Sequence, residues 1–447
     1  MNNISVLKDC YGCGVCVVAC PLNIIELREN KDGFYSPVII NPEKCVECHR
    51  CLDVCAFNHD KLAHQPSSEG TSCYGSWSLN PEVRATSTSG GLGFEIARHM
   101  ILKGYQAIVV RYNTVKHRAE HYAASTVSEL MASKGSKYIP SYTADGFSAI
   151  NKRGKYVIVG LPCQADSIRR YMQKLGIERD CLIVDLLCHG TPSRKSWVRY
   201  LSSIESKTGR VLNVDFRYKG DGWHKSSCSR VEGEKEFVVD RENNPFYRIF
   251  FSDMCLNKCC HYSCKYKLLN SSADIRIGDF WGKTYERNEE GVNAVAAFTE
   301  KGHQVLKELR EKGICYFEAR SVEEFISAQM PDCAPRSLWR PILLWCVCTG
   351  VDLKKVFTNK RIYLVTFIRL VIEPIIALAV IILLGMKNWH PQAENIILIT
   401  YMAAITPCAS TITQMCQVYG NDSKYASAIN VMTTLLAVVT MPGFVYF

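Results

Sequence analysis

Two cysteine runs decide the fold of the first part of the chain: CYGCGVCVVACP at residues 10–21 and CVECHRCLDVC at residues 45–55. Both runs have the spacing C-x-x-C-x-x-C-x-x-x-C. This close spacing lets three thiolates of one short loop bind three irons of a 4Fe-4S cubane, while the fourth cysteine reaches the other cluster. The spacing therefore predicts two 4Fe-4S clusters and electron transfer, with a zinc site or disulfides as the weaker alternatives.

The crossed pattern assigns four sulfurs to each predicted cluster. The first cysteine set is Cys10, Cys13, Cys16 and Cys55, and the second cysteine set is Cys20, Cys45, Cys48 and Cys51. Gly12 and Gly14 allow the first loop to curl, so that backbone amides can point at the sulfurs. Residues 1–60 resemble a two-cluster ferredoxin domain, which has an α+β fold. Ala56 stands where ferredoxins usually have a second proline, but that proline would supply no ligand.

The length and composition of the chain set further limits. A chain of 447 residues is expected to form two or three domains. Its 23 cysteines would suggest disulfides in a short secreted protein, but no signal peptide precedes the first iron motif, so we expect the reducing cytoplasm. The net charge of +10 is not gathered in a basic stripe with interleaved aromatic residues, which argues against nucleic-acid binding. An acidic redox partner or a solvated surface explains the charge more simply.

Alternating helix and strand patterns follow a polar linker at residues 59–72. We expect helices over residues 92–103, 164–174 and 193–206, and strands over residues 107–111, 156–160 and 182–187. Thr126 and Glu129 have the spacing of a capping box, which predicts another helix start. Such strand–turn–helix repeats predict an α/β layer with parallel strands.

Two cysteines lie in turns that directly follow predicted strands. Cys163 lies in GLPCQ and Cys188 lies in CHGTP. Because open α/β sheets bind ligands at the carboxyl ends of their strands, both cysteines should face one crevice. Four more, Cys255, Cys259, Cys260 and Cys264, precede the strand pattern IRIGDFWG at residues 275–282. The spacing leaves a third metal site and unrelated structural cysteines both open.

Five phrases occur in a fixed order along this part of the chain. They are SGG (residues 89–91), GLPCQ (160–164), CHGTPS (188–193), FRYKGDGWH (216–224) and GDFWG (278–282). Together they resemble the beta subunit of coenzyme F-420-reducing hydrogenases and dehydrogenases, over residues 73–330. The resemblance implies an N-terminal-type domain at residues 73–150 and a C-terminal-type domain at residues 151–335. It also implies a bound FAD that exchanges hydride with a deazaflavin and single electrons with iron–sulfur clusters.

The resemblance points to two candidate contacts with FAD. Ser89, Gly90 and Gly91 open a predicted helix, whose N-terminus favours a phosphate group. Asp279 and Trp281, together with Phe280, could supply a polar contact and a stacking face to the flavin. The alternative for these three residues is a strand end packed into the core.

The resemblance also implies a third 4Fe-4S cluster near the flavin. Cys163, Cys188 and Cys264 match cysteines of the family, and Cys260 is our choice for the fourth ligand, with Cys259 as its rival. The choice stays open because His261 stands where the family commonly has the first cysteine of a C-x-x-C pair. Cys73, Cys181 and Cys228 are expected to be ordinary thiols that pack as small apolar residues.

The end of the chain has the composition of a membrane segment. Residues 362–386, 395–418 and 425–447 are long and nearly uncharged, and the first is interrupted only by Arg369 and Glu373. Buried soluble helices are the alternative for the second and third. Lysine and arginine residues flank the first predicted span on its N-terminal side, which predicts that this side is cytoplasmic; they are Lys354, Lys355, Lys360 and Arg361. The redox domains would then be held at the cytoplasmic membrane.

Residues 350–447 resemble the last helices of the auxin efflux carrier family, in which Pro407 would suit a broken helix at a substrate site. Three spans are only the end of such a carrier, so transport by this chain alone is not expected. The segment is interpreted as a fragment joined by an accidental fusion between Met330 and Leu353, or otherwise as a membrane anchor.

The sequence as a whole predicts an iron–sulfur flavoprotein oxidoreductase with a ferredoxin-like domain at residues 1–60, an α/β flavoprotein domain and an all-α transmembrane tail. Its expected partners are a redox protein or a hydride-carrying coenzyme, and a lipid bilayer through the tail. Two other functions compete with this prediction. One is a non-catalytic electron-transfer subunit that lacks flavin, and the other is a membrane transport protein with an accessory redox domain.

Overall fold

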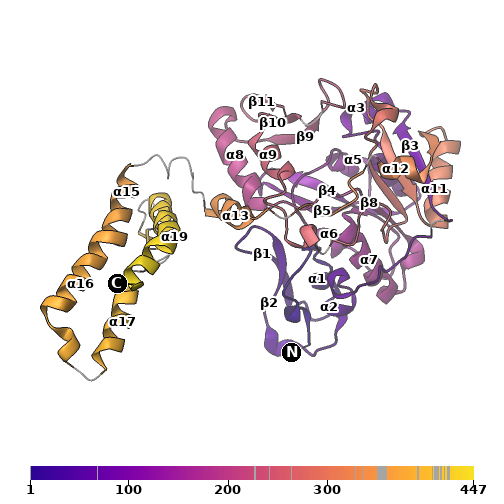
Figure 1. The fold of residues 1–447 in the computed structure, drawn as a ribbon. Coiled ribbons are helices and arrows are strands. Elements are labelled where there is room, and N and C mark those ends of the chain that lie inside the picture. The colour runs from indigo at the N-terminus through magenta and orange to yellow at the C-terminus, as the bar shows by residue number, and fades with distance from the viewer. Residues whose placement is uncertain are drawn as a thin grey trace. The chain divides into compact units, whose positions relative to one another are not determined.

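The computed structural model describes residues 2–67, 69–225, 228–240, 242–262, 264–327, 329–335, 337–349, 360–389, 392–404 and 423–446, with isolated positions between 406 and 419. The chain divides into two compact units, Met1–Pro341 and Ile342–Phe447. The first unit contains all the predicted iron ligands, and its parts are traced from indigo to orange in Figure 1.

Residues 2–60 fold around their own cysteines. The elements are η1 (Ile4–Val6), α1 (Val15–Ala19), β1 (Ile25–Glu29), β2 (Tyr35–Ile39), η2 (Pro42–Lys44), α2 (Arg50–Asp53) and η3 (Ala56–Asn58). Strands β1 and β2 form an antiparallel hairpin. The small core contains Ile4, Ile24, Ile25 and Leu52 packed with Cys16, Cys20, Cys51 and Cys55. The predicted α+β organisation is therefore present, and half of its core consists of cysteines.

The rest of the first unit is built on one mixed sheet of nine strands. The strands are β3 (Ser72–Ser78), β4 (Gln106–Asn113), β5 (Arg118–Ala124), β6 (Ser141–Tyr142), β7 (Tyr156–Gly160), β8 (Cys181–Leu186), β12 (Ile275–Asp279), β13 (Asn293–Ala297) and β14 (Cys315–Arg320). Their order across the sheet is β14-β3-β13-β12-β8-β7-β4-β5-β6. The centre, β12-β8-β7-β4, is parallel, which confirms the predicted parallel layer there.

The prediction of a parallel layer was incomplete at both sides of this centre. Strand β5 pairs antiparallel with β4, and β13 pairs antiparallel with β12. Strand β3 pairs antiparallel with both β13 and β14. The physical reason is connection length: β12 ends at Asp279 and β13 begins at Asn293, which leaves no crossover helix between them to return the chain in the parallel direction.

Helices cover both faces of the sheet, and Figure 1 shows α11 and α7 around it. On one face, α4 (Leu92–Leu102) and α11 (Glu300–Glu311) pack on Val157 and Val184. On the other face, α7 (Pro162–Leu175) packs on Ile158 and Ile183, together with α1 of the cysteine-rich part. Alternate residues of each strand therefore belong to different cores, as the pleat of a central strand requires.

The helices predicted from the sequence are present with small shifts of their ends. Helices α4, α7 and α8 (Arg194–Thr208) correspond to the helices predicted over residues 92–103, 164–174 and 193–206. Helix α5 (Val127–Leu130) begins with the predicted capping box at Thr126. Helix α8 and α9 (Pro245–Phe251) cover a three-stranded antiparallel sheet of β9 (Asn213–Tyr218), β10 (Cys228–Glu232) and β11 (Glu236–Val239). The remaining short elements of this unit are α3 (Pro81–Thr86), η4 (Met131–Ser133), α6 (Ala144–Phe147), η5 (Glu178–Asp180), α10 (Cys259–Tyr262), η6 (Lys283–Tyr285) and α12 (Val322–Ser327).

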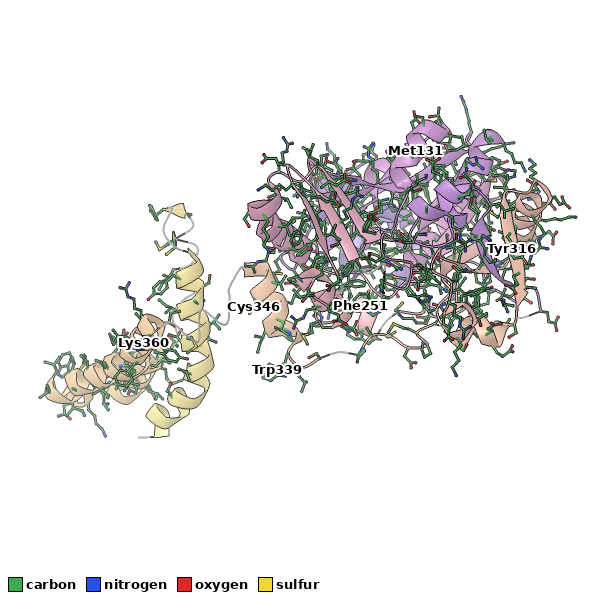
Figure 2. All side chains as sticks on the ribbon, turned by 90° about the horizontal axis from the view of Figure 1, so that it is seen from above. Met131, Phe251, Tyr316, Trp339, Cys346 and Lys360 are labelled. Atoms are coloured by element: carbon green, nitrogen blue, oxygen red, sulfur yellow. The ribbon has the colours of Figure 1, made fainter. Side chains whose placement is uncertain are left out.

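The second unit is helical. After α13 (Arg340–Thr349), segments α15 (Lys360–Phe367), η7 (Ile368–Ile372) and α16 (Glu373–Leu383) form one continuous helix that begins at the Lys360 labelled in Figure 2. This helix has 24 residues and a mean hydropathy of 2.4, and Arg369 pairs with Glu373 within it. η8 (Met386–Asn388), α17 (Ala393–Ala404) and α19 (Ser423–Tyr446) follow.

Only the first of the three predicted spans meets the length and hydropathy of a membrane span among the described residues. Helix α19 covers most of the third predicted span, but it does not meet the same criterion. The second predicted span lies partly outside the described residues. Pro407, Lys354 and Lys355 lie outside them as well. The membrane location of this unit therefore stays a prediction.

Candidate functional site

The second cysteine set encloses a cavity at the surface of the cysteine-rich part. All four of its members line the cavity, which is partly open to solvent; they are Cys20, Cys45, Cys48 and Cys51. Apolar residues Ile24, Ile25 and Ile39 form the inner wall, and Asn3 Nδ2 donates to Cys45 Sγ at 3.4 Å. Glu47 and His49 have positive φ angles of 50° and 61°, so the loop curls around the cavity. A cavity lined by these four cysteines fits a cubane.

The first cysteine set lies deeper in the molecule. Cys13, Cys16 and Cys55 are buried, and Cys10 Sγ accepts a hydrogen bond from the Gly12 backbone N–H at 3.2 Å. Burial, followed by the nearby sulfurs of Cys13 and Cys10, raises the pKa of Cys16 well above its ordinary value. Burial, followed by Cys13, likewise raises the pKa of Cys55 to about 12. Cys51 of the second set also raises the pKa of Cys16 and of Cys55, so these effects do not separate the two sets, and the assignment of the first set stays a prediction.

A third cysteine set gathers at the carboxyl edge of the parallel strands. Its members are Cys163 at the start of α7, Cys188 after β8, Cys260 in α10 and Cys264. Burial raises the pKa of Cys163, and the next causes are Cys13 of the first set and then the other three members of the third set. Burial, followed by Cys260 and Cys264, also raises the pKa of Cys188 to about 12. The structure thus brings together the two turns that the sequence placed in one crevice.

The choice between Cys260 and Cys259 follows from their surroundings. Cys260 lies within electrostatic reach of Cys163, Cys188 and Cys264. Cys259 is turned toward the first cysteine loop, where its sulfur lies 3.5 Å from the carbonyl oxygen of Cys10. These surroundings favour Cys260 over Cys259 as the fourth ligand, and the choice stays a prediction.

Iron would remove the electrostatic cost that these buried sulfurs carry. Desolvation is the first cause of every raised thiol pKa in the first and third sets, so thiolates there need positive charge. A metal cluster supplies that charge directly. Among the described residues, no three Cys, His, Asp or Glu side chains converge closely enough to hold a single ion. The cysteines of a cubane bind separate irons at the corners of a larger cage. A cubane therefore requires a wider spacing of its sulfurs than a single metal ion does.

Helix α7 joins the first and third sets, because Cys163 lies in its first turn and Ser167 lies one turn later. Ser167 Oγ accepts a hydrogen bond from the Ala56 backbone N–H at 3.0 Å and contacts Cys13 Sγ at 3.3 Å. On the neighbouring side, Thr143 Oγ1 donates to the Cys13 carbonyl oxygen at 2.9 Å. The first cysteine loop is thus fixed against the large sheet by buried hydrogen bonds.

The first of the two predicted FAD contacts is the turn of Ser89, Gly90 and Gly91. Ser89 is buried and donates to the Val292 carbonyl oxygen at 2.7 Å. The Leu92 backbone N–H, the first of helix α4, donates to Asn293 Oδ1 at 3.0 Å. Gly90 lies so close to the Ser76 carbonyl oxygen that a Cβ atom would not fit. The Ser89, Gly90 and Gly91 turn is therefore packed against β3 and β13, and its contact with a phosphate stays a prediction.

Asp279 and Trp281 already have partners inside the protein. Asp279 accepts hydrogen bonds from Arg217 at 3.1 Å and from Trp223 Nε1 at 3.1 Å. Trp281 stacks on Trp223 with ring centroids 4.9 Å apart and an interplanar angle of 7°. Phe280 is buried in the neighbouring core. The core-packing alternative therefore describes most of the contacts of these residues, and a flavin contact stays a prediction.

Lys219 binds carbonyl oxygens around the turn of Ser89. Its Nζ donates to the carbonyl oxygens of Ser89 at 3.0 Å, Arg84 at 2.6 Å and Glu290 at 2.7 Å. Burial, followed by the Arg84 charge, lowers the pKa of Lys219 to about 8. Arg84 forms an ion pair with Glu290, whereas Lys219 contacts carbonyl dipoles. The contact of this region with an anion stays a prediction.

Comparison with known proteins assigns this part of the chain. A family model for the C terminus of the coenzyme F420 hydrogenase/dehydrogenase beta subunit matches residues 153–323, which contain the whole third cysteine set. Residues 153–323 therefore match the C-terminal domain of that family. The chain is an iron–sulfur protein of the oxidoreductase type, and the family resemblance seen in the five sequence phrases is confirmed. The likeness of the tail to auxin efflux carriers stays a prediction.

The front of this beta-subunit-type chain matches ferredoxin proteins. A 4Fe-4S dicluster domain model matches residues 9–59, which contain all eight cysteines of the two runs. The ferredoxin-like protein in the nif region of Sinorhizobium fredii is 36% identical over 56 residues, which are 11% of this chain and 78% of that protein. A chain of the F420-reducing [NiFe] hydrogenase complex from Methanosarcina barkeri aligns with 66% of this chain and 93% of its own length, with 16% identity and a TM-score of 0.41.

Some residues of the site were not singled out from the sequence. Arg217, Lys219 and Trp223 stand in the phrase FRYKGDGWH, whose cations and aromatic ring were a usable signal. Tyr11 and Asn257 line a cavity with Cys163, but single residues of these types carry no sequence signal of their own. Their roles follow only from the fold.

The crossed assignment gives the first testable prediction. We expect that Cys20→Ser in the full chain lowers iron at the second site and leaves the first cluster intact, because Cys20 lines the cavity of the second set. Iron content and the electron paramagnetic resonance (EPR) spectra of each cluster, compared with those of Cys55→Ser, measure this. Loss of the first cluster in Cys20→Ser would show that the ligand sets are not crossed.

Proposed function

We propose that this chain carries single electrons between a partner protein and a hydride carrier along three 4Fe-4S clusters held by the three cysteine sets. The observation that carries the proposal is their arrangement. Cys48 of the second set is exposed, Cys13 of the first set is buried in contact with α7, and Cys163 of the third set begins α7 at the edge of the parallel strands. The ligands thus lead from the surface toward the end of the sheet.

The residues between the sets support this route. Ser167 on α7 contacts Cys13, and Asn257, next to the third set, donates to the Cys10 carbonyl oxygen at 3.2 Å. Lys258 forms an ion pair with Asp9 in the same region. Because these contacts join the first loop to both cysteine-bearing segments, they fix the positions of the sites relative to one another. Fixed geometry of this kind favours electron transfer between the sites.

The third site gives the decisive experiment. Anaerobically reconstituted full-length protein should contain about twelve irons, four for each cubane. Cys260→Ser should lose about four of these irons, because its sulfur belongs to the third set. Cys259→Ser is the matched control and should keep them, because that sulfur faces Cys10. Equal iron in all three proteins would remove the third cluster from the proposal.

We also propose that FAD binds near Lys219, where a flavin would exchange hydride with a deazaflavin-type coenzyme and pass single electrons to the clusters. The cations that favour its phosphate groups are Lys219, Arg84 and Arg217, which influence one another's charge. Helix α4 begins at Leu92 beside this group, so its dipole adds to the same field. Asp279 and Trp281 hold Arg217 in place through an ion pair and a cation–π contact at 5.4 Å.

The flavin proposal predicts a dependence on charge and pH. Lys219→Met should weaken FAD binding by roughly tenfold, the size expected for losing one charged contact. Because the pKa of Lys219 is about 8, its positive charge is complete below that pH and is lost above it, so FAD binding should weaken as pH rises through 8. Fluorescence titration with FAD measures both effects. Lys235→Met, which changes an exposed lysine of the small sheet, is the control and should behave as the unaltered protein.

A second candidate function is an electron relay without flavin. The observation that favours it is the internal pairing of Asp279 and Trp281 with Arg217 and Trp223. In that case FAD titration would show no binding to the unaltered protein, while iron content would remain complete. The iron and flavin measurements thus separate the two functions.

We propose that the helix Lys360–Leu383 holds the protein at a membrane. Its 24 residues are long enough to cross a bilayer, and Ile376, Ile382 and Leu383 are exposed. The full chain should therefore fractionate with membranes, and a chain ending at Pro341, the end of the first compact unit, should not. As a control, the absorbance of the clusters is measured in both fractions. Recovery of the full chain without membranes would exclude an anchor.

A further inference from the structure

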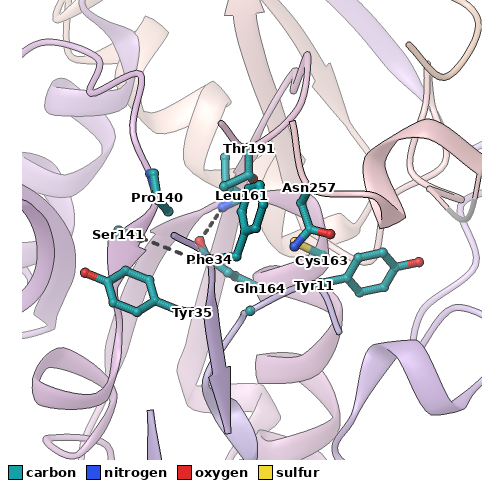
Figure 3. Close-up of a pocket in the computed structure, with 11 residues that line it drawn as sticks. Tyr11, Phe34, Tyr35, Pro140, Ser141, Leu161, Cys163, Gln164, Thr191 and Asn257 are labelled. Carbon is teal, nitrogen blue, oxygen red and sulfur yellow. Dashed lines mark hydrogen bonds between the residues drawn. The ribbon is translucent and has the colours of Figure 1, made fainter. Parts of the chain in front are cut away.

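A buried hydroxyl of helix α7 contacts the sulfur of a cysteine in the first loop. Ser167 Oγ lies 3.3 Å from Cys13 Sγ, and it accepts a hydrogen bond from the Ala56 backbone N–H at 3.0 Å. Ser167 is 0% exposed and Cys13 is 7% exposed, so water does not compete for this contact. Figure 3 shows the start of the same helix, where Cys163 lines a cavity together with Tyr11 of the first loop. Helix α7 therefore faces this loop and reaches its sulfur through Ser167.

The hydrogen bond between Ser167 and Cys13 has one possible direction when Cys13 binds iron. A cysteine that binds a metal is a thiolate without a proton, so its sulfur can only accept. The Ala56 N–H already donates to Ser167 Oγ, and a hydroxyl has one hydrogen of its own to donate. Among the residues that the structure describes, Ser167 Oγ has no further hydrogen-bond partner than these two. The Ser167 O–H therefore donates to the iron-bound sulfur of Cys13.

Cys13 is a ligand of the first loop's cluster whether or not the fourth ligands are crossed. It is the second cysteine of the run at residues 10–21, and the first three cysteines of such a run bind one cluster. The match to the 4Fe-4S dicluster domain at residues 9–59 includes it. Ser167, by contrast, lies outside that domain, on a helix that packs on the large sheet. The large sheet thus supplies a hydrogen-bond donor to a cluster that the cysteine-rich part holds.

We propose that Ser167 sets the reduction potential of the cluster that Cys13 binds, because its O–H donates to Cys13 Sγ and stabilises the reduced state. Reduction adds one electron to the cluster and makes its sulfurs more negative, so the donated hydrogen bond becomes stronger. The buried surroundings do not screen this difference as water would. No proton moves, because the serine hydroxyl keeps its hydrogen in both states. The inference rests on this one cluster of the proposed function, and it requires neither the third cluster nor FAD.

The test is a redox titration of the full-length protein followed by EPR, in which the cluster in question is the one whose signal disappears in Cys13→Ala. Ser167→Ala should make its reduction about tenfold less favourable, which lowers its potential by roughly 59 mV for one electron. The second cluster is an internal reference, because the bond from Asn3 Nδ2 to Cys45 Sγ is untouched. Thr143→Val is the matched control. Thr143 is also fully buried and donates to Cys13, but to its carbonyl oxygen at 2.9 Å, so this change should leave the potential unaltered.

A second pair of variants separates the hydroxyl from the shape of the side chain. Ser167→Thr keeps the donor and should keep the potential, whereas Ser167→Val has the same shape as threonine and should lower it as Ser167→Ala does. Equal potentials in these two variants, or an equal shift in Thr143→Val, would overturn the inference and leave the proposed function intact. Loss of this cluster's iron in Ser167→Ala but not in Thr143→Val would make Ser167 a structural residue only. Absence of the cluster from the unaltered protein would overturn both the inference and the proposed function.

Discussion

The structure of the redox unit depends on a buried contact between one serine and the first cysteine loop. Ser167 on α7 accepts a hydrogen bond from the Ala56 N–H, next to Cys55, and contacts Cys13. One hydroxyl therefore reaches both chain segments of the first cysteine set and satisfies a backbone group that would be costly to bury alone. Because α7 begins at the Cys163 turn, the same helix also sets the position of the third set. Asp166, the preceding residue, accepts hydrogen bonds from Tyr266, Ser272 and the Ala63 N–H. Helix, linker and loop are therefore bound to one another, and the redox unit behaves as one body rather than as domains on a flexible tether.

The sequence predicted the local parts of this structure well. Repeated cysteine spacing is a short-range signal, and the cavity lined by Cys20, Cys45, Cys48 and Cys51 is what the crossed pattern requires. Helix α4 and strands β7 and β8 also follow from apolar periodicity and from Gly104 or turn residues at their ends. In addition, the adjacency of Cys163 and Cys188 followed from the rule that parallel strands end at one edge.

Long-range pairing could not be predicted in the same way. Strand β3 pairs with β13 and β14, which come from the far end of the redox unit, and no local pattern encodes that choice. The partners of Asp279 are of the same kind: Arg217 and Trp223 come from another segment, so the sequence could show a polar residue but not that its hydrogen bonds were taken. Cys259 and Cys260 are adjacent in sequence, and only the different neighbours of their sulfurs distinguish them.

The different exposure of the cysteines has a consequence for durability. Cys48 is exposed, whereas Cys13 and Cys16 are buried and the four cysteines of the third set are half-buried. Oxygen and peroxide reach sulfur and iron through solvent, so oxidative attack begins at the outermost site. Damage there would disconnect the protein from its redox partner before it reached the inner sites. The outermost site would then be the first to be inactivated, and restoring that one cluster would restore electron transfer without replacing the inner clusters.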